Sequence, residues 1–114
     1  MPVRSTVTLD PAAALAEHLR GAAIGPGHPD YDEARRVWNG MIDRRPAAIA
    51  RCADADDVAA AVRFACEHDL PLAVRGGGHN VAGTAVCDDG VVVDLSPMRG
   101  VRLGESGRTV HVQG

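Results

Sequence analysis

The sequence predicts an α+β domain of the α/β type, in which an N-terminal helical arm precedes a βαβ unit and a small mixed β-sheet. Two short apolar runs, 48–52 and 72–74, flank a segment with apolar residues at helical spacing. A continuous β-branched run at 91–93 is typical of a strand buried on both faces. Two further runs, 101–103 and 109–112, are separated by a glycine-containing turn and predict a hairpin.

The arm begins with a predicted short helix over 9–20. Asp10 is a candidate N-cap and Pro11 occupies the first helical position, where its missing N–H costs nothing. The glycine- and proline-rich segment 24–30 is expected to be irregular. A second short helix is expected over 31–39.

Two aromatic residues in this second helix, Tyr31 and Trp38, are expected to anchor the arm onto the core. They are two of only three aromatic residues in the chain. Large aromatic side chains bury the most apolar surface, so a chain with so few of them is expected to use them at its packing contacts.

The central helix of the βαβ unit is the best supported element. Asp54 is placed to cap it, Asp56 and Asp57 lie in its first turn, and it is expected to run to about His68. Apolar residues recur along it at i, i+3, i+4 and i+7. The expected core of the unit is Val58, Val62, Leu72, Val74, Val91 and Val93.

Composition narrows the class of protein. A chain of 114 residues that is 46% hydrophobic forms one small domain. Its net charge of −3, without any basic run, argues against nucleic-acid binding, and no stretch has the length of a membrane span. The cysteines Cys52, Cys66 and Cys87 form no CxxC pair, so we expect reduced, buried thiols in a cytoplasmic protein.

The most informative stretch is Gly76-Gly77-Gly78-His79-Asn80, directly after the run at 72–74. Glycine loses the most conformational entropy on folding, so three in a row indicate a sharp turn or a close approach to a ligand. Unhindered N–H groups in succession form an anion receptor, and pyrophosphate is a suitable anion. A plain tight turn between two strands is the alternative. If the loop leaves a parallel strand, it lies where open α/β sheets bind ligands.

Two well-known phosphate loops do not fit. The Rossmann fingerprint would need a third glycine where Val81 stands. A P-loop read from Gly78 to Gly83 would need lysine where Thr84 stands, and the chain contains no lysine. The glycine loop therefore belongs to neither class.

Residues 74–83, with the Val-Val-Val-Asp-Leu-Ser run at 91–96, resemble the PCMH-type FAD-binding domain of the vanillyl-alcohol-oxidase and berberine-bridge-enzyme-like flavoproteins. The resemblance implies the first FAD-binding subdomain of that fold over 46–114, truncated at the C-terminus, with 1–45 as the arm. It also implies an FAD-dependent oxidoreductase whose flavin N5 accepts a hydride from a small-molecule substrate in the full-length protein.

The resemblance assigns roles to residues of the loop. Those implied to bind FAD are Arg75, Gly76, Gly77, Gly78, His79, Asn80 and Gly83. His79 takes the position of the histidine that is commonly bonded to the flavin 8α-methyl group. No catalytic residue is assigned, since nothing corresponds to the family's substrate-binding domain, and the isolated chain is expected to be inactive.

Other interpretations of these residues remain open. His79 could simply form hydrogen bonds within a loop. A metal site built from His79, Cys87, Asp88 and Asp89 would match no zinc spacing. The chain could also be a non-catalytic nucleotide- or phosphate-binding module, or an inactive truncated fragment.

Overall fold

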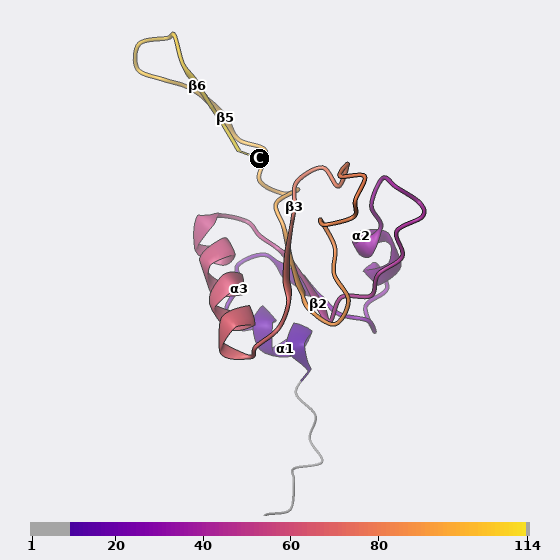
Figure 1. Ribbon diagram of the computed structural model, residues 1–114. Coiled ribbons are helices and arrows are strands. Elements are labelled where there is room, and N and C mark those ends of the chain that lie inside the picture. Colours follow the sequence, from indigo (N-terminus) through magenta and orange to yellow (C-terminus); the bar gives the residue numbers. More distant parts are fainter. Residues whose placement is uncertain (1–9, 114) are drawn as a thin grey trace, which may run out of the picture.

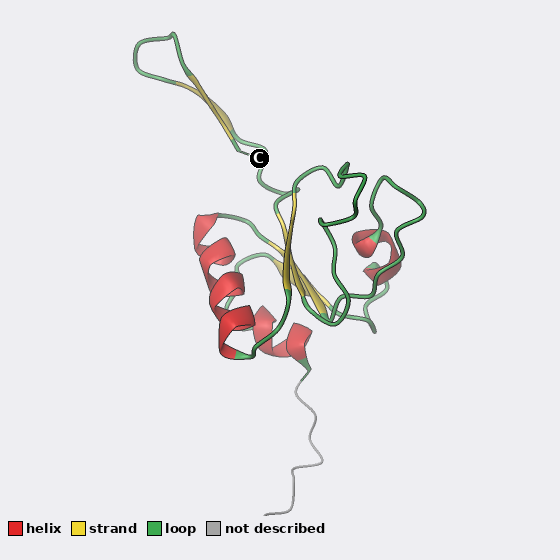
Figure 2. Ribbon diagram, in the orientation of Figure 1, coloured by secondary structure: helices red, strands yellow, loops and turns green. Residues whose placement is uncertain are grey.

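The computed structural model describes residues 10–113, which form a four-stranded mixed sheet with helices on both faces (Figures 1 and 2). The helices are α1 (Pro11–Ala16), α2 (Tyr31–Arg35) and α3 (Ala55–Glu67). The strands are β1 (Ala22–Ile24), β2 (Ala48–Arg51), β3 (Leu72–Arg75), β4 (Val91–Asp94), β5 (Val101–Leu103) and β6 (Val110–Val112). The predicted fold class is confirmed, and among the described residues no helix is long and apolar enough to cross a membrane.

The strands of the main sheet follow the order β1-β2-β4-β3. β4 lies in parallel pairing with both β2 and β3, while β1 pairs antiparallel with β2. All four residues of β4 are buried, as the run at 91–93 predicts. The βαβ unit β2-α3-β3 therefore spans the central strand, and the carboxyl ends of three parallel strands meet at one edge of the sheet.

Each face of the sheet has its own core. On one face, α1 and α3 cover β2 and β4, with Leu15, Phe64, Val91 and Val93 among the buried residues. On the other face, α2 and the loop before β4 pack on alternate residues of the same strands. This second core contains Ile24, Tyr31, Ala34, Val37, Ile49, Ala73, Ala85, Val86 and Val92.

The N-terminal arm is part of the sheet rather than an appendage. Asp10 caps α1 by accepting a hydrogen bond from the N–H of Ala12 at 3.1 Å, as predicted, whereas the predicted start at Leu9 lies outside the described residues. α1 ends at Ala16, earlier than predicted. After α1, the N–H groups of His18 and Leu19 donate to the carbonyls three residues earlier, as in a tighter turn. The N–H groups of Arg20 and Gly21 then donate to Asp57. β1 follows, within a region where no strand is predicted.

The prediction that both aromatics anchor the arm is right for Tyr31 and wrong for Trp38. Tyr31 is buried, and its hydroxyl donates to the carbonyl of Pro46 at 2.7 Å. α2 ends at Arg35 and Arg36 is extended, so Trp38 lies beyond the helix. Val37 then takes the buried position, and Trp38 is left 67% exposed.

The predicted core is correct in the centre of the sheet and wrong at its edge. Val91 and Val93 are buried, and Val58 and Val62 pack against them from α3. Leu72 and Val74 are instead 41% and 54% exposed. Both lie on the face that carries α3, but β3 is an edge strand and α3 packs on β4 and β2.

The prediction of three buried thiols holds only for Cys52, although all three cysteines are free. Burial raises the pKa of Cys52 to about 11, and the nearby carboxylate of Asp57 adds to the shift. Cys66 is exposed, because it lies on the side of α3 away from the buried Phe64 and Ala65. Cys87 is half-buried, at the margin of the second core.

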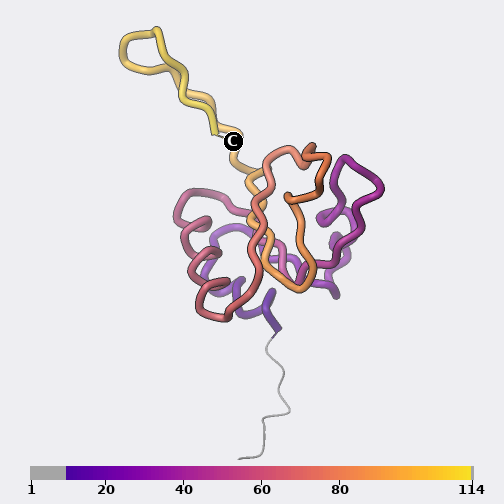
Figure 3. The backbone as a smooth tube through the Cα atoms, viewed as in Figure 1, coloured from indigo at the N-terminus to yellow at the C-terminus, as the bar shows by residue number. Residues whose placement is uncertain are grey.

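The predicted C-terminal hairpin is present, but it stands apart from the sheet (Figure 3). The pairing of Val101 with Val112 and of Leu103 with Val110 places all four apolar side chains on one face of the hairpin. Arg102 pairs with His111 on the opposite face. All six strand residues are exposed.

Asp57 is the one charged side chain of α3 that is buried among the described residues. Its carboxylate accepts hydrogen bonds from the N–H groups of Arg20, Gly21 and Ala53 at 2.8–2.9 Å. The Cβ of any residue replacing Gly21 would collide with the carbonyl of Arg51. Asp57 and Gly21 together therefore hold the end of the arm against the start of α3.

We predict that Asp57→Asn lowers the free energy of unfolding by about 2 kcal/mol, because the charged acceptor of three hydrogen bonds is lost. Burial opposes ionisation, but the three hydrogen bonds prevail and lower the pKa of Asp57. Its stabilisation is thus complete above the unfolded-state pKa of about 3.9, and is lost as pH falls through the lower folded-state pKa.

Urea denaturation between neutral pH and about pH 3 measures this effect. The exposed neighbour Asp56→Asn is the matched control, and we expect it to change stability by about 0.5 kcal/mol or less. Asp57→Asn should also lose less stability than the wild type on acidification, because it has no carboxylate to protonate at this position. Equal stability of Asp57→Asn and Asp56→Asn would contradict the role given to this carboxylate.

Candidate functional site

The glycine loop begins where β3 ends, at the edge of the sheet where the parallel strands have their carboxyl ends (Figure 1). The N–H of Leu95, just after β4, donates to the carbonyl of Arg75 at 2.8 Å. The loop after β3 and the turn after β4 therefore start side by side. This is the position predicted from the sequence, and it is where α/β sheets bind ligands.

The glycine positions of the loop differ in whether the fold could accept a side chain there. Gly78 is buried and has φ of +74°, a conformation that side chains disfavour. Gly83 has φ of +78°, and a Cβ there would lie 2.7 Å from the side chain of Ile42. Gly76 is exposed, and a Cβ there would meet nothing within 4 Å. The fold therefore explains Gly78 and Gly83, but it gives no reason for glycine at Gly76.

The backbone amides of the loop have no hydrogen-bond acceptor in the described part of the chain. None of the N–H groups of 76–80 donates to a backbone or side-chain acceptor within residues 10–113. The first N–H of the loop that does so belongs to Gly83, which donates to the carbonyl of Asn80 at 3.2 Å. Successive free N–H groups near a glycine with positive φ form a concavity that suits an anion.

The arm holds this loop through its backbone carbonyls. The N–H of Trp38 donates to the carbonyl of Gly78 at 2.9 Å, and the amide of Asn39 donates to that of Val81 at 2.9 Å. Arg44 donates to the carbonyl of Gly83 at 2.9 Å. The arm thus engages three carbonyls of the loop, while the N–H groups of 76–80 have no acceptor within residues 10–113.

Arg75 links the base of the loop to α2. Its Nη1 donates to the carbonyl of Ala34 at 2.5 Å, and its Nε lies 3.1 Å from the position that a Cβ of Gly78 would take. Nε is buried and has no partner among the described residues. The guanidinium thus places positive charge directly beneath the buried glycine.

His79 lies exposed on the loop, beside two neighbours. Its ring centroid is 6.4 Å from that of Trp38. Its Cδ2 would be 2.8 Å from a Cβ at Gly77, so a side chain at Gly77 would displace the imidazole. His79 is therefore accessible from outside, and its position depends on the glycine before it.

A groove of about 350 Å³ separates the glycine loop from the turn after β4. Gly76 and Gly77 line one side, and the other side includes Ser96, Met98 and Arg99. The turn is fixed by Asp94, whose buried carboxylate accepts a hydrogen bond from the N–H of Ser96 at 2.9 Å. The groove reaches the unpartnered amides and contains no acidic side chain.

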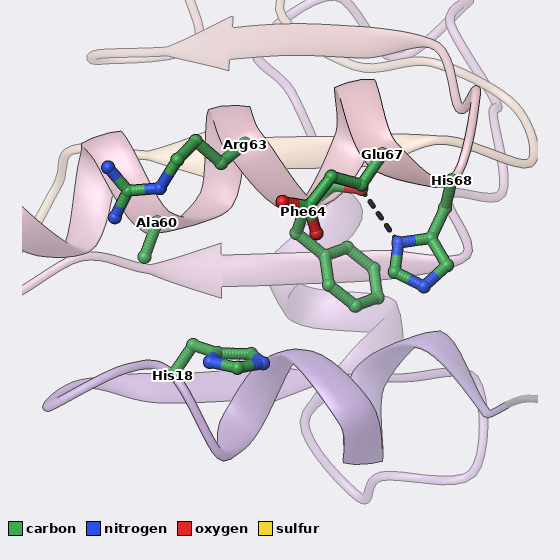
Figure 4. Close-up of a pocket in the computed structure, with 6 residues that line it drawn as sticks. All are labelled: His18, Ala60, Arg63, Phe64, Glu67 and His68. Atoms are coloured by element: carbon green, nitrogen blue, oxygen red, sulfur yellow. Dashed lines mark hydrogen bonds between the residues drawn. The ribbon is translucent and has the colours of Figure 1, made fainter.

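A second cavity, of about 240 Å³, lies between α3 and the segment that follows α1 (Figure 4). His18 faces Phe64 and His68 across it, and the His68 ring stacks on Phe64 at 4.1 Å between centroids. It shares no residue with the groove at the glycine loop. Within residues 10–113, no group of three or more His, Cys, Asp or Glu side chains is placed to hold a metal ion.

The predicted site residues come together because they follow one another along the chain: Arg75 ends β3, and the loop after it contains Gly76, Gly77, Gly78, His79, Asn80 and Gly83. Sequence reasoning missed the support from Trp38, Asn39 and Arg44. It also missed the lining of the groove by Met98 and Arg99. No local signal could have revealed these contacts, since each depends on how distant segments of chain meet.

Comparison with known proteins gives a family. Residues 46–114 match the family model described as an FAD binding domain. The chain is 38% identical over 96 residues to (R)-6-hydroxynicotine oxidase of Paenarthrobacter nicotinovorans, covering 84% of this chain and 21% of that protein. It is 34% identical over 106 residues to the FAD-linked oxidoreductase hasG of Aspergillus fumigatus, covering 92% of this chain and 23% of that protein.

Solved structures agree. The crystal structure of 6-hydroxy-D-nicotine oxidase from Arthrobacter nicotinovorans superimposes with a TM-score of 0.79 at 38% identity, covering 82% of this chain and 21% of that one. The berberine-bridge-enzyme-like protein 1 of Physcomitrella patens shares the fold, with a TM-score of 0.80 at 24% identity, covering 90% of this chain and 22% of that one.

The chain spans about a fifth of the length of the relatives it matches. The glycine loop and the whole β2-to-β6 region fall inside the residues that the family model covers. The chain therefore belongs to the FAD-linked oxidoreductases with a PCMH-type FAD-binding domain, the berberine-bridge-enzyme-like group of the vanillyl-alcohol-oxidase family.

Proposed function

We propose that this chain is the part of a flavin-dependent oxidoreductase that holds the diphosphate of FAD and tethers its flavin. The observation that carries the proposal is the run of unpartnered N–H groups at 76–80, at the carboxyl edge of a parallel sheet. The family match supplies the identity of the ligand. When bound, FAD would supply hydride acceptance at its N5 from a small organic substrate.

The residues present fit a diphosphate. Gly76 and Gly77 are exposed and carry no side chain, so a bulky anion can approach their N–H groups. The groove beside them contains no carboxylate to repel a negative charge. Arg75 adds positive charge beneath the loop, and its buried Nε has no acceptor within residues 10–113.

The accessibility of His79 supports its role as the tether. It follows the anion-binding glycines directly and is exposed, so a ligand whose diphosphate lies on Gly76 and Gly77 would bring its flavin within reach of the imidazole. When FAD is bound, an imidazole nitrogen of His79 would replace one hydrogen of the flavin 8α-methyl group. One C–H and one N–H bond would break, the two protons and two electrons released would reduce the flavin, and dioxygen would reoxidise it. The role of the protein is then to fix the orientation of the flavin ring. The ring of Trp38 lies close to this tether, with its centroid 6.4 Å from that of the His79 imidazole.

We predict that His79→Ala abolishes the covalent bond without preventing FAD binding, since the loop amides do not depend on the imidazole. Acid precipitation should leave yellow flavin on the wild-type polypeptide and release it from the variant. His111→Ala, an exposed histidine on β6, is the matched control and should keep its flavin. Complete release of flavin from the wild type would contradict the tether while leaving FAD binding intact.

The loop backbone can be tested separately at Gly76. We predict that Gly76→Val prevents FAD uptake, because its side chain would occupy the approach to the loop amides. The fold should be unaffected, since a Cβ at this position meets nothing within 4 Å. Flavin absorbance per polypeptide measures the effect.

Gly27→Val is the control for Gly76→Val. Gly27 is also exposed, and a Cβ there likewise meets nothing within 4 Å, but it lies in the arm before α2. Both variants should melt at the wild-type temperature. Normal flavin content in Gly76→Val would show that the loop is only a turn.

A further inference from the structure

We infer that Arg99 is a further ligand-binding residue, which contacts the diphosphate of FAD from the side of the groove opposite the glycine loop. This inference rests on the proposed function and adds a residue that no motif in the sequence indicates. It follows from the position of Arg99, its hydrogen bonding and the charge of its surroundings.

Arg99 lies across a groove from the glycine loop. β3 and β4 are parallel neighbours, so the glycine loop and the 95–99 turn leave the same edge of the sheet together. The groove of about 350 Å³ between them is lined by Gly76 and Gly77 on one side and by Arg99 on the other. That volume lies within the range of about 300–1,000 Å³ typical of small-ligand sites.

The side chain of Arg99 is held by one nitrogen and leaves the others free. Its Nε donates to the carbonyl of Ser96 at 3.0 Å, within the turn that Asp94 fixes. Its two terminal nitrogens make no hydrogen bond or ion pair with any residue of 10–113. An arginine held in this way presents two donors in a planar fork, the geometry that binds phosphate oxygens.

Within residues 10–113, the groove has one charged side chain in its lining. Arg99 is the only charged residue that lines the groove among the described residues. By contrast, Arg35 is paired with Asp32 and Asp43, and the Nη1 of Arg75 is engaged by the carbonyl of Ala34. A diphosphate in the groove would thus meet backbone N–H groups on one side and an unpaired guanidinium on the other.

The test compares the wild type with Arg99→Gln and Arg99→Lys, each also carrying His79→Ala so that FAD binds reversibly, using FAD, ADP and riboflavin as ligands in isothermal titration calorimetry. Arg102→Gln is the matched control, because Arg102 is an exposed arginine on β5 that does not line the groove. Both glutamine variants change the net charge equally. The only tryptophan, Trp38, gives a second readout, since flavin bound near His79 should quench its fluorescence.

We expect Arg99→Gln to raise the Kd for FAD and for ADP about tenfold, which is the loss of one charge-assisted contact. The Kd for riboflavin, which has no phosphate, should not change, and Arg99→Lys should recover part of the loss. Salt should weaken wild-type binding of ADP more than that of the variant.

The outcomes separate the two proposals. Unchanged FAD affinity in Arg99→Gln, or an equal loss in Arg102→Gln, would overturn the role of Arg99 and leave the proposed function standing. A wild type that binds ADP but neither flavin would keep the anion site and overturn the flavin assignment. A wild type that binds none of the three ligands would overturn both.

Discussion

The parallel pairing of β4 with β2 and β3 at once is the constraint on which the rest of the structure depends. β4 is buried on both faces, because α1 and α3 cover it on one side and α2 with the loop before β4 covers it on the other. The same pairing brings the loop after β3 and the turn after β4 to a common edge. The core and the candidate site are therefore consequences of one arrangement of strands.

The arm has a second task besides covering the sheet. Its residues Trp38, Asn39 and Arg44 donate to carbonyls of the glycine loop, and Arg75 returns the contact by donating to α2. A loop rich in glycine loses much conformational entropy when it is ordered. These contacts offset part of that cost while leaving the N–H side of the loop free for a ligand.

Local signals predicted the elements well. Asp54 caps α3, Asp10 caps α1, and the valines of β4 mark the central strand, because each of these features depends on neighbouring residues alone. The glycine loop was likewise recognisable from its own residues.

The solvent exposure of individual side chains could not be predicted from neighbouring residues in the same way. Leu72 and Val74 have the composition of a core strand, but their exposure follows from the position of β3 at the edge of the sheet. The exposure of Trp38 follows from the early end of α2. For the same reason the groove opposite the glycine loop, with Arg99, could be found only once the two segments were seen together.

In the proposed complex, the free amides of 76–79 bind the diphosphate of FAD. Titrating FAD into the ¹⁵N-labelled chain and following its amide resonances by NMR tests this directly. We expect the largest shifts at Gly76, Gly77 and Gly78 and no change at Gly107 in the hairpin turn. Saturable binding of FAD that leaves the three loop glycines unshifted would contradict it.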